Sequence, residues 1–405
     1  FMSATNPLWA SAVLLTERMV QPMDKPTVQD IFHRFYPAYL DQYSPSPVQA
    51  KVAHNIMNCK TGAYGANVCV CEDCGFVQIH YNSCRYRCCP MCQAVPKEMW
   101  MDARREDVLD APYFHLVFTV PDILNPVIYS NQRLLYDALY HAASSTISEL
   151  TADPKHLGAK VGYICILHTW GSEMNFHPHI HTILLGGGLA SNNQWKDNGE
   201  NFFLPIRVIS KMFRGKYLEE LKRLWEEDKL VFHGTAEKFR NHYTFKELLD
   251  SCYGMDWIPH CKKTFNGAQT VIKYLGKYTH RIAVSNHRIV RMDDDTVTFL
   301  VKDYRNEGQW KELTISGVEF VRRFLMHVPP RRFVRIRHYG LLCSRTKSQK
   351  LTLCRNLLGC KKYLSKLRDM EMPEILEHLY GIKVCVCKAC GGHLGKPQMR
   401  MPLRC

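Results

Sequence analysis

The stretch that decides the fold is FHPHIHTILLGGG, residues 176–188. In a β-strand, residues i, i+2 and i+4 lie on the same face. The alternation therefore predicts that His177, His179 and His181 point to one side of a sheet, while Ile180 points into the opposite layer. We expect the apolar run that follows to be a buried strand that stops at the glycines of 186–188.

Three imidazoles on one strand face indicate a metal site. At about 3.3 Å per residue the outer two lie roughly 13 Å apart, too far to bind one ion together. Pro178 cannot donate to a neighbouring strand and favours a strand start, so His179 and His181 are the predicted ligands of a catalytic divalent ion. Candidates for a third ligand are His177, Glu173 and Gln269. A surface patch of histidines is the alternative interpretation.

A second stretch, AQTVIKYLGKYTHRI at residues 268–282, contains no proline and predicts a helix, although Gly276 costs about 1 kcal/mol relative to alanine. The positions that share one stripe of this helix are Tyr274, Lys277, Tyr278 and Arg281. A neighbouring apolar stripe is expected to pack on a sheet; it consists of Ala268, Val271, Ile272, Leu275 and Ile282. The tyrosines and cations are then left facing a cleft or solvent, although Tyr278 could equally flank the core.

Chemistry connects the two stretches. A phenol has a pKa near 10, so it attacks phosphorus poorly at neutral pH unless the developing negative charge is stabilised. A divalent ion held by imidazoles polarises a phosphate oxygen, and Lys277 would add a positive charge beside it. The expected catalytic residues are therefore Tyr274, Tyr278 and Lys277.

Eighteen cysteines include three Cys-x-x-Cys pairs. In a basic chain that we expect to have no signal peptide, such pairs predict zinc thiolates rather than disulfides. Two pairs separated by fourteen residues resemble a zinc ribbon and predict one structural zinc held by Cys71, Cys74, Cys89 and Cys92. Candidates for a second site are Cys59, Cys84 and Cys88, with Cys69 and His80. The third pair, Cys387 and Cys390, is half a site that Cys385, His393, Cys405 or a distant cysteine could complete.

Charge favours a nucleic acid partner. Lys and Arg outnumber Asp and Glu by 53 to 38, a net charge of +15, which suits phosphate neutralisation. Residues 321–340 carry six arginines, no acid and several aromatics, as expected for phosphates and stacked bases. The predicted DNA-binding residues are Arg281, Arg331, Arg332, Arg335 and Arg337. A solvated basic face is the alternative.

Taken together, these motifs resemble the HUH-type two-tyrosine transposases of the insertion-sequence ninety-one family, relatives of rolling-circle replication initiators. The resemblance is carried by HPHIHTILLGGG (177–188), YLGKYTHRIAVSN (274–286), VRIRHYGLL (334–342) and SCRYRCCPMCQ (83–93). His179-Ile180-His181 matches the family's His-hydrophobic-His metal motif, and Tyr274 and Tyr278 match its paired nucleophiles. The family often has histidine where this chain has Asn67 and Cys88.

The resemblance implies an α+β fold: a ferredoxin-like or RNA-recognition-like antiparallel sheet with helices on one face, plus a zinc-ribbon-like N-terminal domain. It implies an enzyme that uses Mg²⁺ or Mn²⁺, needs no ATP, and acts on single-stranded DNA at transposon ends and in the target. Cleavage and rejoining by transesterification would pass through a 5′-phosphotyrosine and move an insertion sequence by a rolling-circle-like route.

Four regions are expected: a leader arm (1–30), a zinc-binding domain (31–105), the nuclease domain (106–330) with a helical insertion around 190–265, and a basic, Cys-containing region (331–405). No apolar run is long enough for a membrane span, so a cytoplasmic, nucleoid-associated prokaryotic protein is expected. The competing hypotheses are a plasmid replication initiator or relaxase, and a non-enzymatic zinc-containing DNA-binding protein.

Overall fold

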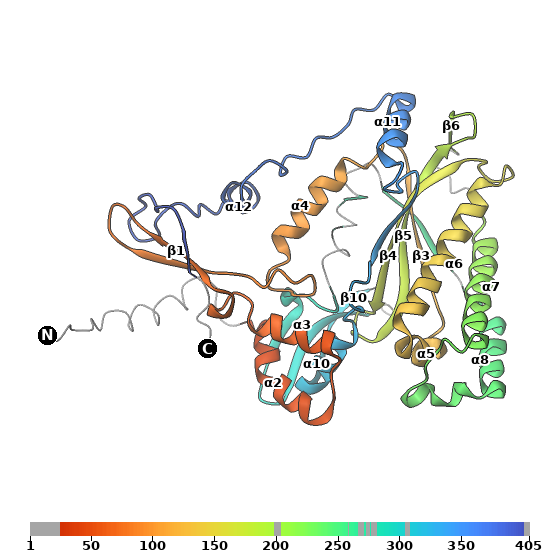
Figure 1. Cartoon of the computed structure of the whole chain (residues 1–405), viewed down its shortest axis with the longest axis horizontal. Coiled ribbons are helices and arrows are strands. Elements are labelled where there is room, and N and C mark those ends of the chain that lie inside the picture. Colours follow the sequence, from red (N-terminus) through yellow and green to blue (C-terminus); the bar gives the residue numbers. More distant parts are fainter. Residues whose placement is uncertain are drawn as a thin grey trace. The chain divides into compact units, whose positions relative to one another are not determined.

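A computed structural model describes residues 25–197, 204–257, 259–265, 271–272, 276, 282–303 and 308–400 (Figure 1). The chain forms two compact units. Unit 1 comprises Phe1–Gln93, Val284–Arg322 and Glu371–Cys405, and unit 2 comprises Ala94–Ala283 and Arg323–Met370. This division differs from the consecutive regions expected from the sequence, because the C-terminal segment belongs with the N-terminal one.

Unit 2 is built on a six-stranded antiparallel sheet with the order β11-β4-β5-β3-β7, in which β6 also pairs with β5. The strands are β3 (Tyr113–Thr119), β4 (Lys160–Trp170), β5 (Phe176–Leu189), β6 (Trp195–Asp197), β7 (His260–Phe265) and β11 (Ile336–Gly340). In the sequence, the short β-rich runs at 114–120, 161–167 and 179–185 predict strands, and β3, β4 and β5 confirm all three. They form the centre of the sheet, where β5, the strand that carries the histidines, lies between β4 and β3.

Helices α6 and α7 cover one face of this sheet, which we call the first face. The helices of unit 2 are α4 (Ala94–Arg105), η2 (Asp122–Leu124), α5 (Asn125–Ser130), α6 (Gln132–Ala152), α7 (Ile206–Glu226), η3 (Gly234–Arg240), α8 (His242–Gly254) and α11 (Lys347–Leu358). Helix α6 lies between the sheet and α7 (Figure 1). In the sequence, Phe213, Tyr217, Leu221 and Leu224 lie at helical spacing among charged residues, which predicts an amphipathic helix at 210–228. The structure confirms it, because Phe213, Tyr217 and Leu221 of α7 are fully buried in this core.

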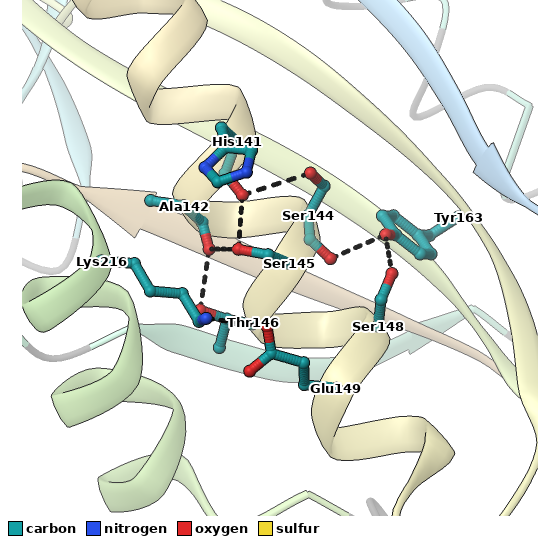
Figure 2. Close-up of polar contacts among 9 residues, drawn as sticks. All are labelled: His141, Ala142, Ser144, Ser145, Thr146, Ser148, Glu149, Tyr163 and Lys216. Atoms are coloured by element: carbon teal, nitrogen blue, oxygen red, sulfur yellow. Dashed lines mark hydrogen bonds and ion pairs between the residues drawn. The ribbon is translucent and has the colours of Figure 1, made fainter. Parts of the chain in front are cut away.

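Polar contacts fix α6 on the sheet (Figure 2). The Tyr163 hydroxyl of β4 donates to the Ser144 carbonyl oxygen at 2.9 Å and lies 2.7 Å from Ser148 Oγ. On the other side of the helix, Lys216 of α7 forms a 2.8 Å ion pair with Glu149. The three-layer stack of sheet, α6 and α7 is therefore joined by directional bonds as well as by apolar packing.

The second face also carries helical residues, so the expectation of helices on one face is incomplete. Val271 and Ile272 are helical and almost fully buried in a core with Ile183 and Leu185 of β5. Residues of α11 belong to the same core, and Trp100 and Met101 of α4 pack against it. The apolar stripe predicted for the 268–282 helix thus reaches the sheet at Val271 and Ile272. Ile282, the third described position of that stripe, is buried but is not helical.

The three glycines at 186–188 do not end β5, as the sequence had suggested, but lie inside it. A Cβ at Gly188 would overlap the Lys160 carbonyl oxygen, and one at Gly187 would overlap the Trp195 ring. The glycines are needed because neighbouring strands approach too closely for a side chain.

Unit 1 contains two three-stranded antiparallel sheets, β12-β1-β2 and β10-β9-β8. Its elements are α2 (Val28–Gln42), α3 (Pro47–Met57), η1 (Gly62–Tyr64), β1 (Ala66–Val70), β2 (Val77–Tyr81), η4 (Asn286–Arg288), β8 (Ile289–Met292), β9 (Thr296–Asp303), β10 (Gln309–Ser316), α12 (Met372–Tyr380) and β12 (Gln398–Arg400); α10 (Gly317–Met326) begins in unit 1 and ends in unit 2. Capping boxes start α2 and α3, because Thr27 with Asp30 and Ser46 with Gln49 satisfy the free amides of the first turns.

Within the described part of the chain, no helix is both long enough and apolar enough to cross a membrane.

Candidate metal centres and catalytic residues

Three buried imidazoles meet on the second face of the unit 2 sheet. Their metal-binding nitrogens lie within 4.8 Å of one another and belong to His168, His179 and His181. His179 and His181 come from β5, and His168 comes from β4, where it stands opposite His179 in the strand register. The structure therefore brings the two predicted ligands together and adds a third that the sequence reasoning missed.

The alternation of residues along β4 could have identified His168 from the sequence. The predicted strand was ended at Leu167, but β4 continues to Trp170. On β4 the alternation places Ile164, Ile166 and His168 on one face, the face whose core contains both isoleucines. Extending the alternation by one position would have placed His168 beside the histidine strand.

The geometry of the cluster suits one ion. His179 Nε2 and His181 Nε2 are 3.0 Å apart, the separation expected for two ligands at about 2.1 Å and a right angle around a metal. The ring of His168 lies 4.5 Å from that of His181, centre to centre. Three imidazoles are also a donor set that divalent transition metals accept, so the residues fit such an ion.

Backbone and side chain partners set the orientation of both β5 rings. His179 Nδ1 lies 2.6 Å from the His177 carbonyl oxygen and donates to it, which leaves Nε2 available for a metal. His181 Nδ1 lies 2.9 Å from His115 Nε2 of β3, and the two rings stack. Such outer contacts fix the tautomer of a metal-binding histidine.

The side chain of His177 lies outside the cluster. Its Nδ1 is 3.2 Å from Asp122 Oδ1, and more than a third of the side chain is exposed. Glu173 is not in the cluster either, and Gln269 lies outside the described residues. His177 instead contributes its carbonyl oxygen to the site.

Burial keeps the imidazoles of His179 and His181 neutral. Desolvation, with a smaller effect of the neighbouring His177, lowers the pKa of His179 to about 4. The pKa of His181 is also lowered well below its usual value, first by burial and then by the adjacent His168 and His179. Both rings therefore have free lone pairs at neutral pH, as metal coordination requires.

The predicted nucleophiles Tyr274 and Tyr278, together with Lys277 and Arg281, lie outside the described residues. Gly276, which lies between them in the sequence, is helical and buried. A Cβ at this position would overlap the side chain of Met101 in α4. Gly276 weakens the predicted helix, but its lack of a side chain allows the backbone at this position to lie close to Met101.

Two of the predicted DNA-binding arginines, Arg331 and Arg332, are exposed. Arg337 is occupied within unit 2, since it pairs with Asp137 and stacks 4.0 Å above the Tyr140 ring. Its position on β11 turns it toward α6.

Arg335 is buried, with its guanidinium carbon 5.9 Å from the centre of the Trp170 ring. Trp170 in turn stacks on His168, with ring centres 4.7 Å apart. This arginine therefore lies one aromatic ring away from the histidine cluster.

Eight of the cysteines form two separate quartets in unit 1. The first consists of Cys59, Cys84, Cys89 and Cys92, and the second of Cys71, Cys74, Cys387 and Cys390. The single quartet predicted from Cys71, Cys74, Cys89 and Cys92 is therefore divided between two sites. Each Cys-x-x-Cys pair predicted from the spacing stays together in one quartet, but its partners in that quartet are cysteines from elsewhere in the sequence.

The remaining cysteine candidates take no part in these quartets. Cys69 and Cys88 are buried and Cys385 and His393 are exposed, and none of the four belongs to a quartet. Cys405 lies outside the described residues. Four thiolates are the usual ligands of a closed structural zinc, so each quartet fits one zinc ion.

Comparison with known proteins agrees with this architecture. Residues 31–120 match the family described as "Transposase zinc-binding domain", and residues 162–350 match the family described as "Putative transposase". The second match contains the histidine cluster, and the first contains the whole of one cysteine quartet and half of the other.

Full-length relatives extend the match. The chain is 40% identical over 369 residues to "Putative transposase y4qJ" of Sinorhizobium fredii, which covers 90% of this chain and 93% of that protein. It is 30% identical over 309 residues to "Transposase for insertion sequence element IS801" of Pseudomonas savastanoi pv. phaseolicola, covering 75% and 72%. A solved structure of the conjugative relaxase TrwC with oriT DNA aligns over 43% of this chain and 65% of its own, at 14% identity and a TM-score of 0.24. On the sequence relationships, this chain belongs to the insertion-sequence ninety-one family of transposases.

Proposed function

We propose that this transposase cuts and rejoins single-stranded DNA through a covalent bond between a tyrosine and a DNA 5′-phosphate, and so moves an insertion sequence by a rolling-circle-like route. The observation that carries the proposal is the cluster of His168, His179 and His181. Three buried imidazoles on paired strands, of which His179 and His181 are neutral, are expensive to desolvate together. A metal ligand role accounts for all three.

In this proposal the three histidines hold one Mg²⁺ or Mn²⁺ ion. When bound, the ion would polarise a nonbridging oxygen of the scissile phosphate and stabilise the charge that develops there. Imidazole ligands favour Mn²⁺ over Mg²⁺, which prefers oxygen. The His177 carbonyl and the His115 ring would hold two of the ligands in the orientation that binding needs.

Tyr274 and Tyr278 are the proposed nucleophiles. The phenolic oxygen of one tyrosine forms a bond to phosphorus, the bond from phosphorus to the 3′-oxygen breaks, and the leaving strand gains a proton as a free 3′-hydroxyl. Lys277 would offset the negative charge of the transition state. The burial of Val271 and Ile272 on the sheet face that carries the histidines supports this assignment, since these residues begin the same predicted helix.

A second tyrosine gives the reaction a second step. One strand end remains attached to the first tyrosine while the other tyrosine cleaves a second strand, such as the target. A free 3′-hydroxyl then attacks the phosphotyrosine and releases the phenol. The number of phosphodiester-type bonds is conserved throughout, so no ATP is required.

Basic residues would hold the strand. We propose that the exposed Arg331 and Arg332 contact phosphates and that Arg335, beside Trp170 and the histidine cluster, contributes positive charge near the scissile phosphate. Arg337 has partners within unit 2, so we propose no DNA contact for it.

The test uses purified full-length protein with single-stranded oligonucleotides from the ends of its own element, with Mn²⁺ or with the ion omitted. We expect an ion-dependent protein–DNA adduct that survives denaturation and maps to Tyr274 or Tyr278. The double variant Tyr274→Phe with Tyr278→Phe should form no adduct, whereas Tyr243→Phe, at an exposed position in α8, should react normally.

The same experiment separates the alternatives. An adduct with a fixed plasmid origin but not with element ends would favour a replication initiator or relaxase. Normal DNA binding without any adduct would favour a non-enzymatic DNA-binding protein. Full activity of the double tyrosine variant would overturn the mechanism.

A further inference from the structure

Two short segments of unit 1, separated by more than 300 residues, carry the same sequence pattern. Residues 71–76 read CEDCGF and residues 387–392 read CKACGG, so both are Cys-x-x-Cys-Gly. The first segment follows β1, and the second precedes β12. The family match to a zinc-binding domain ends at residue 120 and therefore includes only the first segment.

The backbones of the two segments have the same hydrogen bonds. Gly75 N donates to the Cys71 carbonyl oxygen at 3.0 Å, and Gly391 N donates to the Cys387 carbonyl oxygen at 3.0 Å. Both glycines have a positive φ, +71° and +76°, which explains why glycine follows each pair. The same turn geometry at two distant positions shows that the two segments form equivalent two-thiol corners.

The two corners face each other. Cys71 Sγ lies 3.5 Å from Cys390 Sγ, and Cys74 Sγ lies 3.8 Å from Cys387 Sγ. Thiolates bound at about 2.3 Å in a tetrahedron are about 3.8 Å apart, so these separations match a four-thiolate site.

Backbone amides add to the fit, since an amide directed at a thiolate stabilises its negative charge. Ala389 N and Gly392 N each lie 3.4 Å from a cysteine sulfur of the second corner and donate to it.

Strand pairing holds the corners together. β1 lies between β2 and β12, and Cys71 forms an isolated bridge with Leu394. Gly395 N donates to the Val70 carbonyl oxygen at 2.9 Å. The apolar core of this region is small and consists of Cys69, Cys71, Cys387 and Leu394. So few apolar side chains do not stabilise a sheet of three short strands, which therefore needs another source of stability.

We propose that Cys71, Cys74, Cys387 and Cys390 bind a second structural zinc ion that joins the two ends of the chain into one zinc ribbon. This site is separate from the quartet of Cys59, Cys84, Cys89 and Cys92. Cys74 and Cys390 are exposed, whereas Cys59 and Cys89 of the other quartet are buried. The C-terminal segment thereby becomes part of the zinc-binding domain. Because metal binding and folding are coupled in small sites, β12 would pair with β1 only in the zinc-bound protein.

The test is the zinc content of full-length protein, measured by native mass spectrometry under reducing conditions. We expect two zinc ions per chain in the wild type and one in Cys387→Ser with Cys390→Ser. A matched control, Cys343→Ser with Cys360→Ser, changes two cysteines outside both quartets and should retain two. Hydrogen exchange of the β1 amides should rise in the first variant and stay unchanged in the control.

Three results would overturn the proposal: one zinc ion in the wild type, two in Cys387→Ser with Cys390→Ser, or loss of both ions in that variant, since the last would mean that the quartets are not separate. None of these readouts depends on DNA cleavage. The zinc ribbon and the proposed function can therefore fail independently.

Discussion

His168 lies opposite His179 on two paired strands, and its ring stacks on the Trp170 indole and lies edge-on to the His179 ring. We predict that His168→Ala weakens Mn²⁺ binding by at least about tenfold, because it removes one of three nitrogen ligands. The change should be measured by titrating Mn²⁺ and following the free ion by electron paramagnetic resonance.

His177→Ala is the matched control for this prediction. It removes an imidazole next to the cluster but keeps the carbonyl oxygen that orients His179, so Mn²⁺ affinity should change little. Equal losses in the two variants would mean that His168 acts through general packing and is not a ligand.

His338 makes folding stability depend on pH. Burial lowers its pKa to about 4, helped by the positive charges of Arg104 and Lys347 and opposed by Asp107. Its Nε2 is buried without a hydrogen-bond partner among the described residues. The unfolded chain takes up a proton at about pH 6.5, whereas the folded protein does so only near pH 4. Stability is therefore full above about pH 6.5 and is lost as the pH falls from there toward 4.

We predict that this group alone costs up to about 3 kcal/mol of folding free energy across that window. His338→Leu should flatten the difference between urea unfolding at pH 7.5 and at pH 5. His233→Leu, at an exposed position of unit 2, serves as the control. If His338→Leu loses as much folding stability between pH 7.5 and pH 5 as the wild type does, other groups cause the loss.

At the scale of the element, β5 depends on its glycines. Gly188 lies where a Cβ would overlap the backbone of β4, whereas the space around Gly215 in the middle of α7 is open. We predict that Gly188→Ala lowers the free energy of unfolding by about 1–3 kcal/mol through overpacking. Gly215→Ala should raise it by up to about 1 kcal/mol, because alanine favours a helix. Urea unfolding of both variants tests the pair, and a neutral Gly188→Ala would mean that the strands can separate at no cost.

The sequence was informative wherever the structure depends on local periodicity. Strand alternation placed His179 and His181 on one face, and helical spacing predicted the buried stripe of α7 with Phe213 and Leu221. The glycines of β5 were misread because their role depends on β4 and β6, which no local pattern reveals.

Pairing over long distances could not be predicted. Spacing identified Cys71 with Cys74 and Cys387 with Cys390 as two-thiol corners, but a corner does not specify its partner. On spacing alone, Cys89 and Cys92, which are nearer in the sequence, were an equally reasonable choice of partner for Cys71 and Cys74. Only the strand order β12-β1-β2 decides between them, and that order depends on contacts across almost the whole chain.

At the scale of the whole molecule, two kinds of candidate metal site belong to different units and offer different ligands. Unit 2 holds the three imidazoles, and unit 1 holds the two quartets of thiols. Thiolate zinc sites contribute about 10–16 kcal/mol of apparent binding free energy and are coupled to folding. Imidazole ligands bind Mn²⁺ most weakly among the divalent transition metals. DNA cleavage and folding stability should therefore respond separately to the removal of metal ions.

We predict that dialysis against buffer free of divalent ions abolishes formation of the DNA adduct while leaving both zinc ions and the unfolding midpoint unchanged. Added Mn²⁺ should then restore cleavage without any refolding step, because the strands that carry His168, His179 and His181 are held by the sheet and not by the ion. A thiol reagent that releases zinc should act in the opposite way, raising the hydrogen exchange of β1 and β2 while that of β4 and β5 stays low. Loss of cleavage and of zinc in the same step would mean that one metal serves both purposes, because separate sites of such different affinity would not empty together.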